Sequence, residues 1–218
     1  MVMRILICGD SYCVTDLDYA GLHWSEKLAD RGHDVINLAR GGCSNALITL
    51  QLLHGLGFDP DLVIFSFTTE SRLEFDRDRN SRPLPQDPVS VSSHIHSRYM
   101  TNLNGSMTAA QESMMKLWLT ESSQDLEKFK SYFNIGFCLM LAQQRGLKFC
   151  FSLGGFEYEH DWRSLLQHHS VPDILAPFGG HELQLNLWPH TGAGIRPWFH
   201  VDDDAVHTAF ARECLTHA

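Results

Sequence analysis

The chain has 218 residues, 44% hydrophobic and 20% charged, which is enough for one hydrophobic core with an insertion. The formal net charge of −9 argues against nucleic acid or an acidic membrane surface as a partner. No apolar stretch approaches the roughly 18 residues of a transmembrane helix, and no signal peptide precedes the first expected strand, so we expect a cytoplasmic protein.

The first third of the chain alternates short apolar runs with helical patterns. Strands are expected where the apolar runs occur, over residues 3–8, 35–38 and 62–67. Helices are expected between them, over residues 18–31 and from Ser44 or Asn45 to Leu56. The last run is apolar throughout, which is typical of a strand buried on both faces.

The rest of the chain is less regular. Residues 76–109 carry three prolines and a Ser/His/Asn-rich run, which predicts an irregular insertion over the surface. Further elements are expected as a helical stretch from Ala110 to Gly146, a strand over 147–153, a short fifth strand at Ile174-Leu175 and a last helix over 203–216. Three tryptophans of the C-terminal third are candidates for stacking on sugar rings or for packing under loops: Trp162, Trp188 and Trp198.

Strands joined by helices imply a mostly parallel sheet that is covered on both faces. We therefore expect an α/β fold, a flavodoxin-like three-layer sandwich with a five-stranded sheet in the order 2-1-3-4-5. Residues 1–218 are expected to form a single domain with the insertion at about 76–109. No Gly-x-Gly-x-x-Gly or Walker pattern is present, so no nucleotide is expected.

The cysteines and histidines do not predict a metal site. None of the six cysteines forms a Cys-x-x-Cys pair, and most lie in apolar segments, as reduced thiols of a cytoplasmic protein do. The 13 histidines are scattered without ligand spacing. We expect no metal and no cofactor.

Three loops at the carboxyl ends of the first three strands carry unusual residues. The first strand ends in Gly9-Asp10-Ser11, the second is followed by Gly41-Gly42-Cys43-Ser44-Asn45, and the third by Thr68-Thr69-Glu70-Ser71-Arg72. The carboxyl ends of parallel strands meet at one rim, where open α/β sheets place their ligands. The rim is therefore the predicted site, and Ser11 lies on it.

Two of these loops resemble the SGNH (GDSL) hydrolases, which are serine esterases and acyl hydrolases on a flavodoxin-like fold. The resemblance rests on Gly9-Asp10-Ser11 and on Asn37-x-x-x-x-Gly42. The pattern Gly-Gly-x-Ser-Asn with Thr68-x-x-x-Arg72-x-Glu74 is similar to a divergent branch of phage and bacterial members. The resemblance implies Ser11 as nucleophile, with the backbone N–H groups of Ser11 and Gly42 as oxyanion donors.

The third oxyanion donor departs from the family pattern. Family members supply an Asn after the third strand, but Glu70 stands there in this chain, and an ionised carboxylate cannot donate. A threonine hydroxyl, at Thr68 or Thr69, or the Asn45 amide are the alternatives. Asp10 and Arg72 complete the candidate substrate-binding set, with a solvated ion pair as the alternative for Arg72.

The general base has two candidates. The family ends in Asp-x-x-His, and Asp204-Ala205-Val206-His207 matches that pattern literally. However, His207 falls inside the expected last helix, whereas His200 lies in the loop before it, where the resemblance places the base. We favour His200, oriented by Asp202 or Asp204 or acting in a dyad with Ser11, and keep His207 as the alternative.

Two functions remain open from the sequence. The first is an esterase that acts through an acyl-enzyme on Ser11, on a small-molecule or glycan ester such as a carbohydrate O-acetyl group. The second is a catalytically reduced module that binds a glycan or a protein through the same rim, as a phage-associated or virion-associated protein would. The oligomeric state, including a homo-oligomer, is left open.

Overall fold

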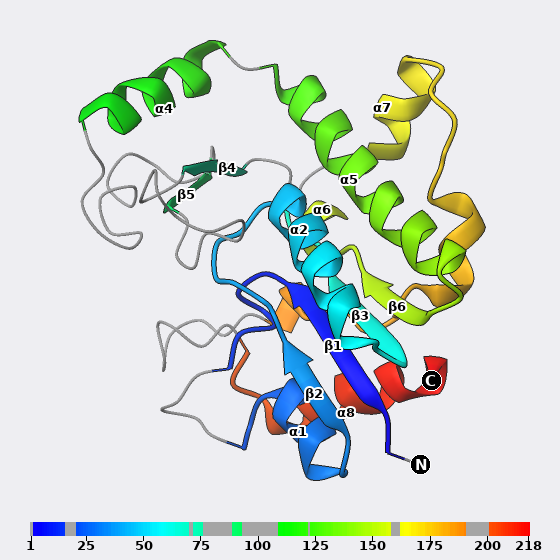
Figure 1. Ribbon diagram of the computed structural model, residues 1–218. Helices are drawn as coiled ribbons and strands as arrows, with labels where there is room; N and C mark the ends of the chain where they lie inside the picture. The colour runs from blue at the N-terminus through cyan, green and yellow to red at the C-terminus, as the bar shows by residue number, and fades with distance from the viewer. Residues whose placement is uncertain are drawn as a thin grey trace.

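A four-stranded parallel sheet forms the centre of the protein, whose computed structural model is drawn in Figure 1. The structure describes residues 2–15, 21–69, 72–75, 89–92, 109–121, 123–157, 162–190 and 201–218. The sheet has the strand order β2-β1-β3-β6. Its strands are β1 (Arg4–Gly9), β2 (Asp34–Asn37), β3 (Leu62–Ser66) and β6 (Lys148–Ser152). The expected parallel α/β sheet is confirmed in class and in the order of its first four strands.

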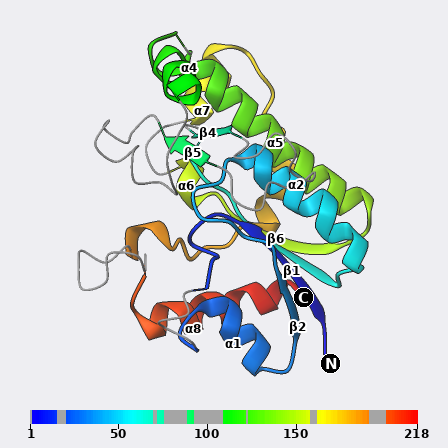
Figure 2. The same cartoon turned by 60° about the vertical axis from the view of Figure 1, so that its left-hand side comes forward.

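Helices cover both faces of the sheet, which gives the expected three layers (Figure 2). One face carries α1 (Trp24–Asp30) and α8 (Asp204–Cys214), and the other carries α2 (Asn45–Gly55) and α5 (Gln124–Gln144). Side chains alternate along β1. Ile5 and Ile7 join the hydrophobic cluster on the face covered by α1 and α8, and Leu6 and Cys8 join the cluster on the face covered by α2 and α5. Burial on both faces explains why β1 and β3 are apolar throughout.

The expected fifth strand at Ile174-Leu175 is wrong. These two residues pack against α5, where Gly136 lies next to the Ile174 side chain, and they precede the 3₁₀ helix η3 (Ala176–His181). Their apolar character therefore comes from contact with a helix. In the described part of the chain, the fifth position of the sheet holds only a parallel bridge between Phe151 and Glu182, with Leu183 N–H donating to Phe151 O at 2.8 Å.

Helix ends also differ from the expectation. α1 begins at Trp24 rather than residue 18 because His23 caps it, with the ring accepting from the Ser25 N–H and Glu26 completing a capping box. α2 is capped by Ser44, as expected. The stretch expected to be helical from Ala110 forms two helices, α4 (Ala109–Glu121) and α5, and Ser123 caps the second.

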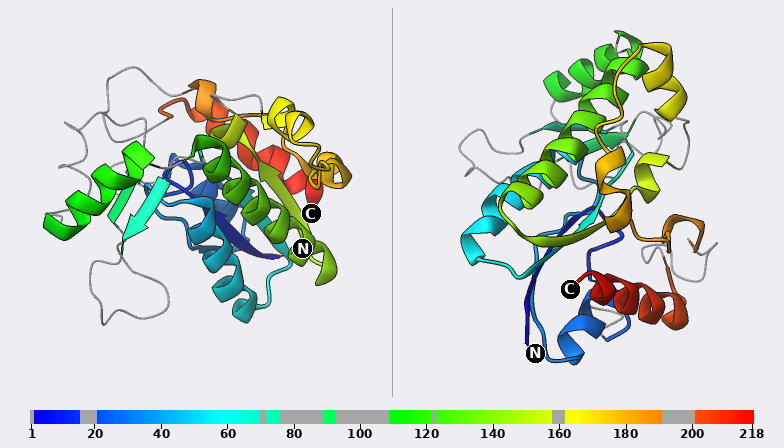
Figure 3. Two further views of the ribbon diagram at one scale, coloured as in Figure 1. Left: turned by 90° about the horizontal axis from the view of Figure 1, so that it is seen from above. Right: turned by 90° about the vertical axis from the view of Figure 1, so that its right-hand side faces the viewer.

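One segment of the predicted insertion at 76–109 is a strand. It is β5 (Val89–Ser92), which pairs antiparallel with β4 (Arg72–Phe75) just before the insertion, and the residues between the two strands lie outside the described ranges. In Figures 1 and 3 this ribbon and α4 lie beyond the carboxyl ends of the sheet strands. The remaining short helices are α6 (Gly154–Glu157), α7 (Trp162–His168), η2 (Leu56–Phe58), η4 (Trp188–His190) and η5 (Leu215–His217). None of the helices in the described ranges combines the length and apolar character needed to cross a membrane.

Candidate active site

Ser11 lies at the tip of a tight turn that follows β1. Cys13 N–H donates to Asp10 O at 3.0 Å, and Tyr12 N–H donates to Asp10 Oδ1 at 3.1 Å, so the turn closes around the serine. Gly9 must be a glycine because a Cβ there would lie 2.5 Å from Cys13 Sγ. Ser11 itself is partly exposed, while its neighbours Asp10 and Tyr12 are buried. The turn therefore presents the serine at the rim.

The carbonyl groups beyond Ser11 are anchored to other elements. Tyr12 O lies 3.0 Å from both His23 Nε2 and Trp24 Nε1 at the start of α1. Cys13 O accepts from Asn37 Nδ2 at 2.7 Å, which ties the turn to the end of β2. A nucleophile needs a backbone held in one geometry, and these three contacts supply it. They also give Asn37, part of the sequence motif, a structural role.

The loop after β2 passes beside Ser11. A Cβ on Gly41 would lie 3.9 Å from Ser11 Cβ, and Gly42 has φ +75°, a conformation that favours glycine. Cys43 Sγ donates to Gly9 O at 3.3 Å, and Gln51 bonds both the N–H and the carbonyl of Gly9. Within the described residues, the backbone N–H groups of Ser11 and Gly42 donate to no protein acceptor. Both N–H groups therefore remain candidate oxyanion donors.

Asn45 and Thr68 form a buried lock between α2 and the end of β3. Asn45 Oδ1 accepts from Thr68 N–H at 2.9 Å, and Asn45 Nδ2 donates to Thr68 O at 2.8 Å and to Ser131 Oγ at 3.1 Å. Both amide hydrogens of Asn45 are used in these bonds, so none is left for an oxyanion. Asn45 instead holds the backbone of Thr68 in place.

Thr68 is the remaining candidate for the third donor. Gly9 pairs with Ser66 in the sheet, so Ser11 and Thr68 each follow by two residues the last paired positions of the neighbouring strands β1 and β3. The Thr68 Oγ1 is buried and has no hydrogen-bond partner among the described residues. An unpartnered buried hydroxyl is costly and calls for an explanation, which a donor reserved for a transient charge provides.

Arg72 and Asp10 form an ion pair inside the protein rather than a substrate contact. The Arg72 Nη2 group lies 3.5 Å from Asp10 Oδ2, and Arg72 Nη1 donates to Cys43 O at 2.9 Å. The Arg72 side chain is 11% exposed and that of Asp10 is fully buried. Neither the expected substrate contact nor the solvated ion pair describes this geometry. The guanidinium joins the loops after β1 and β2.

His207 is buried, and both of its ring nitrogens are engaged. Nδ1 accepts from Trp24 N–H at 3.3 Å, so the proton lies on Nε2, which donates to Val201 O at 2.8 Å. This geometry does not leave His207 a nitrogen for Ser11. His200, the favoured base, lies outside the described residues, and its role stays a prediction.

The acidic residues before α8 have other partners. Asp203 caps the helix by accepting from Ala205 N–H at 2.8 Å, and Asp204 pairs with Lys27 Nζ at 2.6 Å. The hydrogen bond from Lys27 lowers the pKa of Asp204. Asp202 is exposed, and it directly follows Val201. The structure thus assigns Asp204 to the contact between α1 and α8 instead of to the base.

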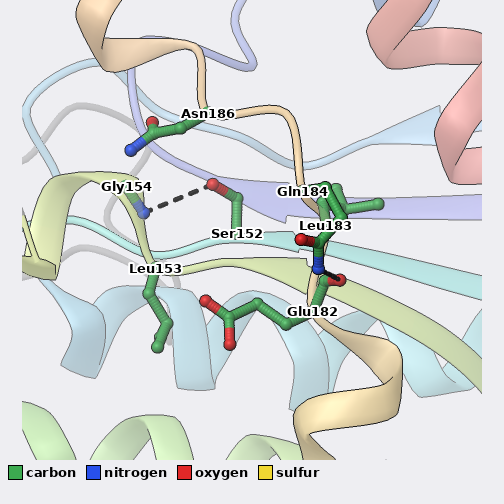
Figure 4. A pocket seen from close by; sticks show the side chains of 7 residues that line it. All are labelled: Ser152, Leu153, Gly154, Glu182, Leu183, Gln184 and Asn186. Atoms are coloured by element: carbon green, nitrogen blue, oxygen red, sulfur yellow. Dashed lines mark hydrogen bonds between the residues drawn. The ribbon is translucent and has the colours of Figure 1, made fainter.

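An aromatic side chain and a polar cavity lie along the same rim. Trp188 stacks on Tyr12 with ring centroids 4.7 Å apart, and it lies so close to Gly154 and Gly155 that a Cβ on either would clash with its ring. Beside it is a cavity of about 240 Å³, seen in Figure 4. Its lining consists of Ser152, Leu153, Gly154, Glu182, Leu183, Gln184 and Asn186. Sequence reasoning missed this cavity because it lies where the fifth strand was expected.

Among the described residues, no group of three or more His, Cys, Asp or Glu side chains lies close enough together to hold a metal ion.

Several solved structures have a similar fold. A protein from Desulfitobacterium hafniense DCB-2 assigned to the G-D-S-L family of lipolytic proteins has a TM-score of 0.51 and 8% identity, over 99% of both chains. TesA has a TM-score of 0.51 and 13% identity, over 98% of this chain and 97% of its own. This chain has the fold of the GDSL hydrolases.

A third structure with a similar fold comes from a Pseudoalteromonas species. It is the psychrotrophic esterase EstA, in a structure inhibited by monoethylphosphonate, with a TM-score of 0.50 and 12% identity over 98% of this chain and 95% of its own. Neither a protein-family model nor a curated protein matches the sequence. The likeness is therefore one of fold across nearly the whole chain, and the chemistry has to be argued from the site.

Proposed function

We propose that the protein is a serine ester hydrolase that works through an acyl-enzyme on Ser11. One observation carries the proposal: a partly exposed serine on an anchored turn lies beside Gly41, and the backbone N–H groups of Ser11 and of the next glycine, Gly42, have no acceptor among the described residues. This is the arrangement that acyl transfer needs, because a nucleophile and an oxyanion site must lie within reach of one carbonyl group.

The reaction follows from these roles. His200 takes the Ser11 proton as Oγ attacks the ester carbonyl carbon, and the negative charge develops on the carbonyl oxygen. The N–H groups of Ser11 and Gly42, with the Thr68 hydroxyl, donate to that oxygen. The intermediate collapses, the C–O bond to the alcohol breaks, and His200 protonates the leaving alkoxide. Water, deprotonated by His200, then attacks the acyl-enzyme. The bond to Ser11 Oγ breaks, His200 returns the proton to Ser11, and the acid leaves.

The cavity at the sheet edge favours an ester of a polyhydroxylated alcohol, such as an O-acylated sugar. Ser152 pairs with Ser66 and Ser66 with Gly9, so the cavity begins two strand spacings, about 10 Å, from the Ser11 turn. Its carboxylate, amides and hydroxyl can bond several hydroxyl groups. Trp188, partly exposed between the cavity and Tyr12, offers a face on which a sugar ring can stack.

Covalent labelling tests the proposed function directly. An activated ethylphosphonate ester should inactivate the protein and add one phosphonyl group to the peptide that contains Ser11, as mass spectrometry would show. The same preparation should hydrolyse p-nitrophenyl acetate and should release acetate from an acetylated methyl glycoside. Acetate release from the glycoside but not from an acetylated simple alcohol would support the sugar class. A wild-type protein that is neither labelled nor active would support the binding-module alternative instead.

The third donor leads to a separate prediction. Thr68→Val keeps the shape of the side chain but removes the hydroxyl, so kcat for p-nitrophenyl acetate should fall by about 10²-fold, the usual cost of one oxyanion donor. Because Oγ1 has no partner among the described residues, the melting temperature should stay constant or rise. Thr68→Ser is the matched control and should keep most of the rate. Equal rates for the Val and Ser variants would remove Thr68 from the oxyanion site.

A further inference from the structure

Two buried histidines connect the Ser11 turn to the segment that follows His200. His23 Nε2 lies 3.0 Å from Tyr12 O, one residue beyond Ser11. His207 Nε2 lies 2.8 Å from Val201 O, one residue beyond His200. The two rings lie against each other with centroids 5.3 Å apart, at the contact between α1 and α8.

Trp24 completes the connection. Its backbone N–H donates to His207 Nδ1 at 3.3 Å, and its indole Nε1 donates to Tyr12 O at 3.0 Å. A single residue of α1 therefore contacts both the Ser11 turn and the ring that bonds Val201. The candidate nucleophile and the favoured base are 189 residues apart in the sequence. The residues that follow them, Tyr12 and Val201, are nevertheless both bound by buried side chains that contact each other.

Burial keeps both rings neutral, which the hydrogen bonds require. Desolvation and the neighbouring His207 lower the pKa of His23 to about 3. The pKa of His207 is also lowered, mainly by desolvation, with Lys27 acting in the same direction and Asp203 and Asp204 acting against it. A neutral His207 can accept at Nδ1 and donate at Nε2, whereas a protonated ring would lose the contact with Trp24 N–H.

We infer that His207 is a positioning residue, which holds the Val201 carbonyl and thereby joins the start of the segment before α8 to the Ser11 turn through Trp24. The inference rests on the proposed function. It also gives the literal Asp-x-x-His match at 204–207 a structural role. Asp204 pairs with Lys27 of α1, and His207 accepts from Trp24 N–H and donates to Val201 O.

Two substitutions separate the two bonds of His207. His207→Gln can place an amide N–H where Nε2 stands and so keep the bond to Val201 O. His207→Asn can place an oxygen where Nδ1 stands and so keep the bond to Trp24 N–H, but it cannot reach Val201. The two variants should lose similar stability, since each leaves one of the two bonds unmade.

Activity should distinguish them. The Asn variant should lose about 10²-fold in kcat for p-nitrophenyl acetate and in the rate of phosphonate labelling at Ser11, with KM changed little. The Gln variant should stay within about fivefold of the wild type. His54→Gln, at an exposed position on α2, is the control for a histidine change as such. Equal losses in the Asn and Gln variants, or wild-type kcat in the Asn variant, would overturn the inference.

A second measurement needs no variant. In a serine phosphonate adduct the general base carries the proton it has taken, so ring ¹⁵N shifts of the labelled wild-type protein identify the base. The His207 shifts should show the neutral Nε2–H form before and after labelling. Protonation of His207 in the adduct would make it the base and overturn the inference while supporting the proposed function. A wild-type protein that is not labelled at all would overturn both.

Discussion

Ser11→Ala should reduce the hydrolysis of p-nitrophenyl acetate by about 10⁴-fold or more, with the melting temperature unchanged. The rate falls because the acyl-enzyme has no other nucleophile to form on, and the oxyanion donors alone retain only a small residual rate. Stability should hold because no described residue forms a hydrogen bond with the Ser11 side chain, and the turn is closed by backbone groups and by Asp10.

Controls make this result specific. Ser164→Ala changes an exposed serine on another element, the helix α7, and should keep the wild-type rate. Both variants are measured on protein purified side by side, so that a contaminating esterase would appear equally in each. A Ser11→Ala protein as active as the wild type would show that the hydrolysis does not use this serine.

The parts of the site that the sequence predicted are those that local chemistry determines. A strand that ends in Gly9-Asp10-Ser11 favours a turn, and Gly42 stands where the backbone has positive φ, so the turn that carries Ser11 and the loop that carries Gly42 follow from short segments. The parallel direction of the strands follows in the same way from their alternation with helices.

The parts that the sequence missed depend on contacts between distant segments. Ile174-Leu175 is apolar because it packs on a helix, and no local pattern separates that from a strand. The two strands of the β4–β5 ribbon do alternate in polarity, but the prolines between them predicted an irregular segment. Asp204-x-x-His207 has the right spacing for a catalytic pair, yet spacing does not tell which atoms the His207 nitrogens contact.

Arg72→Met should lower the free energy of unfolding by about 3–5 kcal/mol, measured by urea denaturation. The substitution keeps much of the apolar stem but leaves the fully buried Asp10 carboxylate without its cation, and an uncompensated buried charge is costly. It also removes the donor to Cys43 O, so the loops after β1 and β2 lose the side chain that joins them. Activity should fall in the folded fraction as well, because Ser11 and Gly42 stand on those two loops.

A double substitution separates charge from shape. Asp10→Asn combined with Arg72→Met removes both charges, so the double variant should be more stable than Arg72→Met alone by several kcal/mol. Arg72→Lys keeps a positive charge but cannot reach Asp10 and Cys43 O together, so it should recover stability better than activity. If Arg72→Met unfolds at the same urea concentration as the wild type, the ion pair does not stabilise the fold.

If the double variant is no more stable than Arg72→Met, the loss comes from the missing Cys43 contact and not from the buried charge. The site would then depend on Arg72 as a brace between two loops rather than as the counter-ion of Asp10.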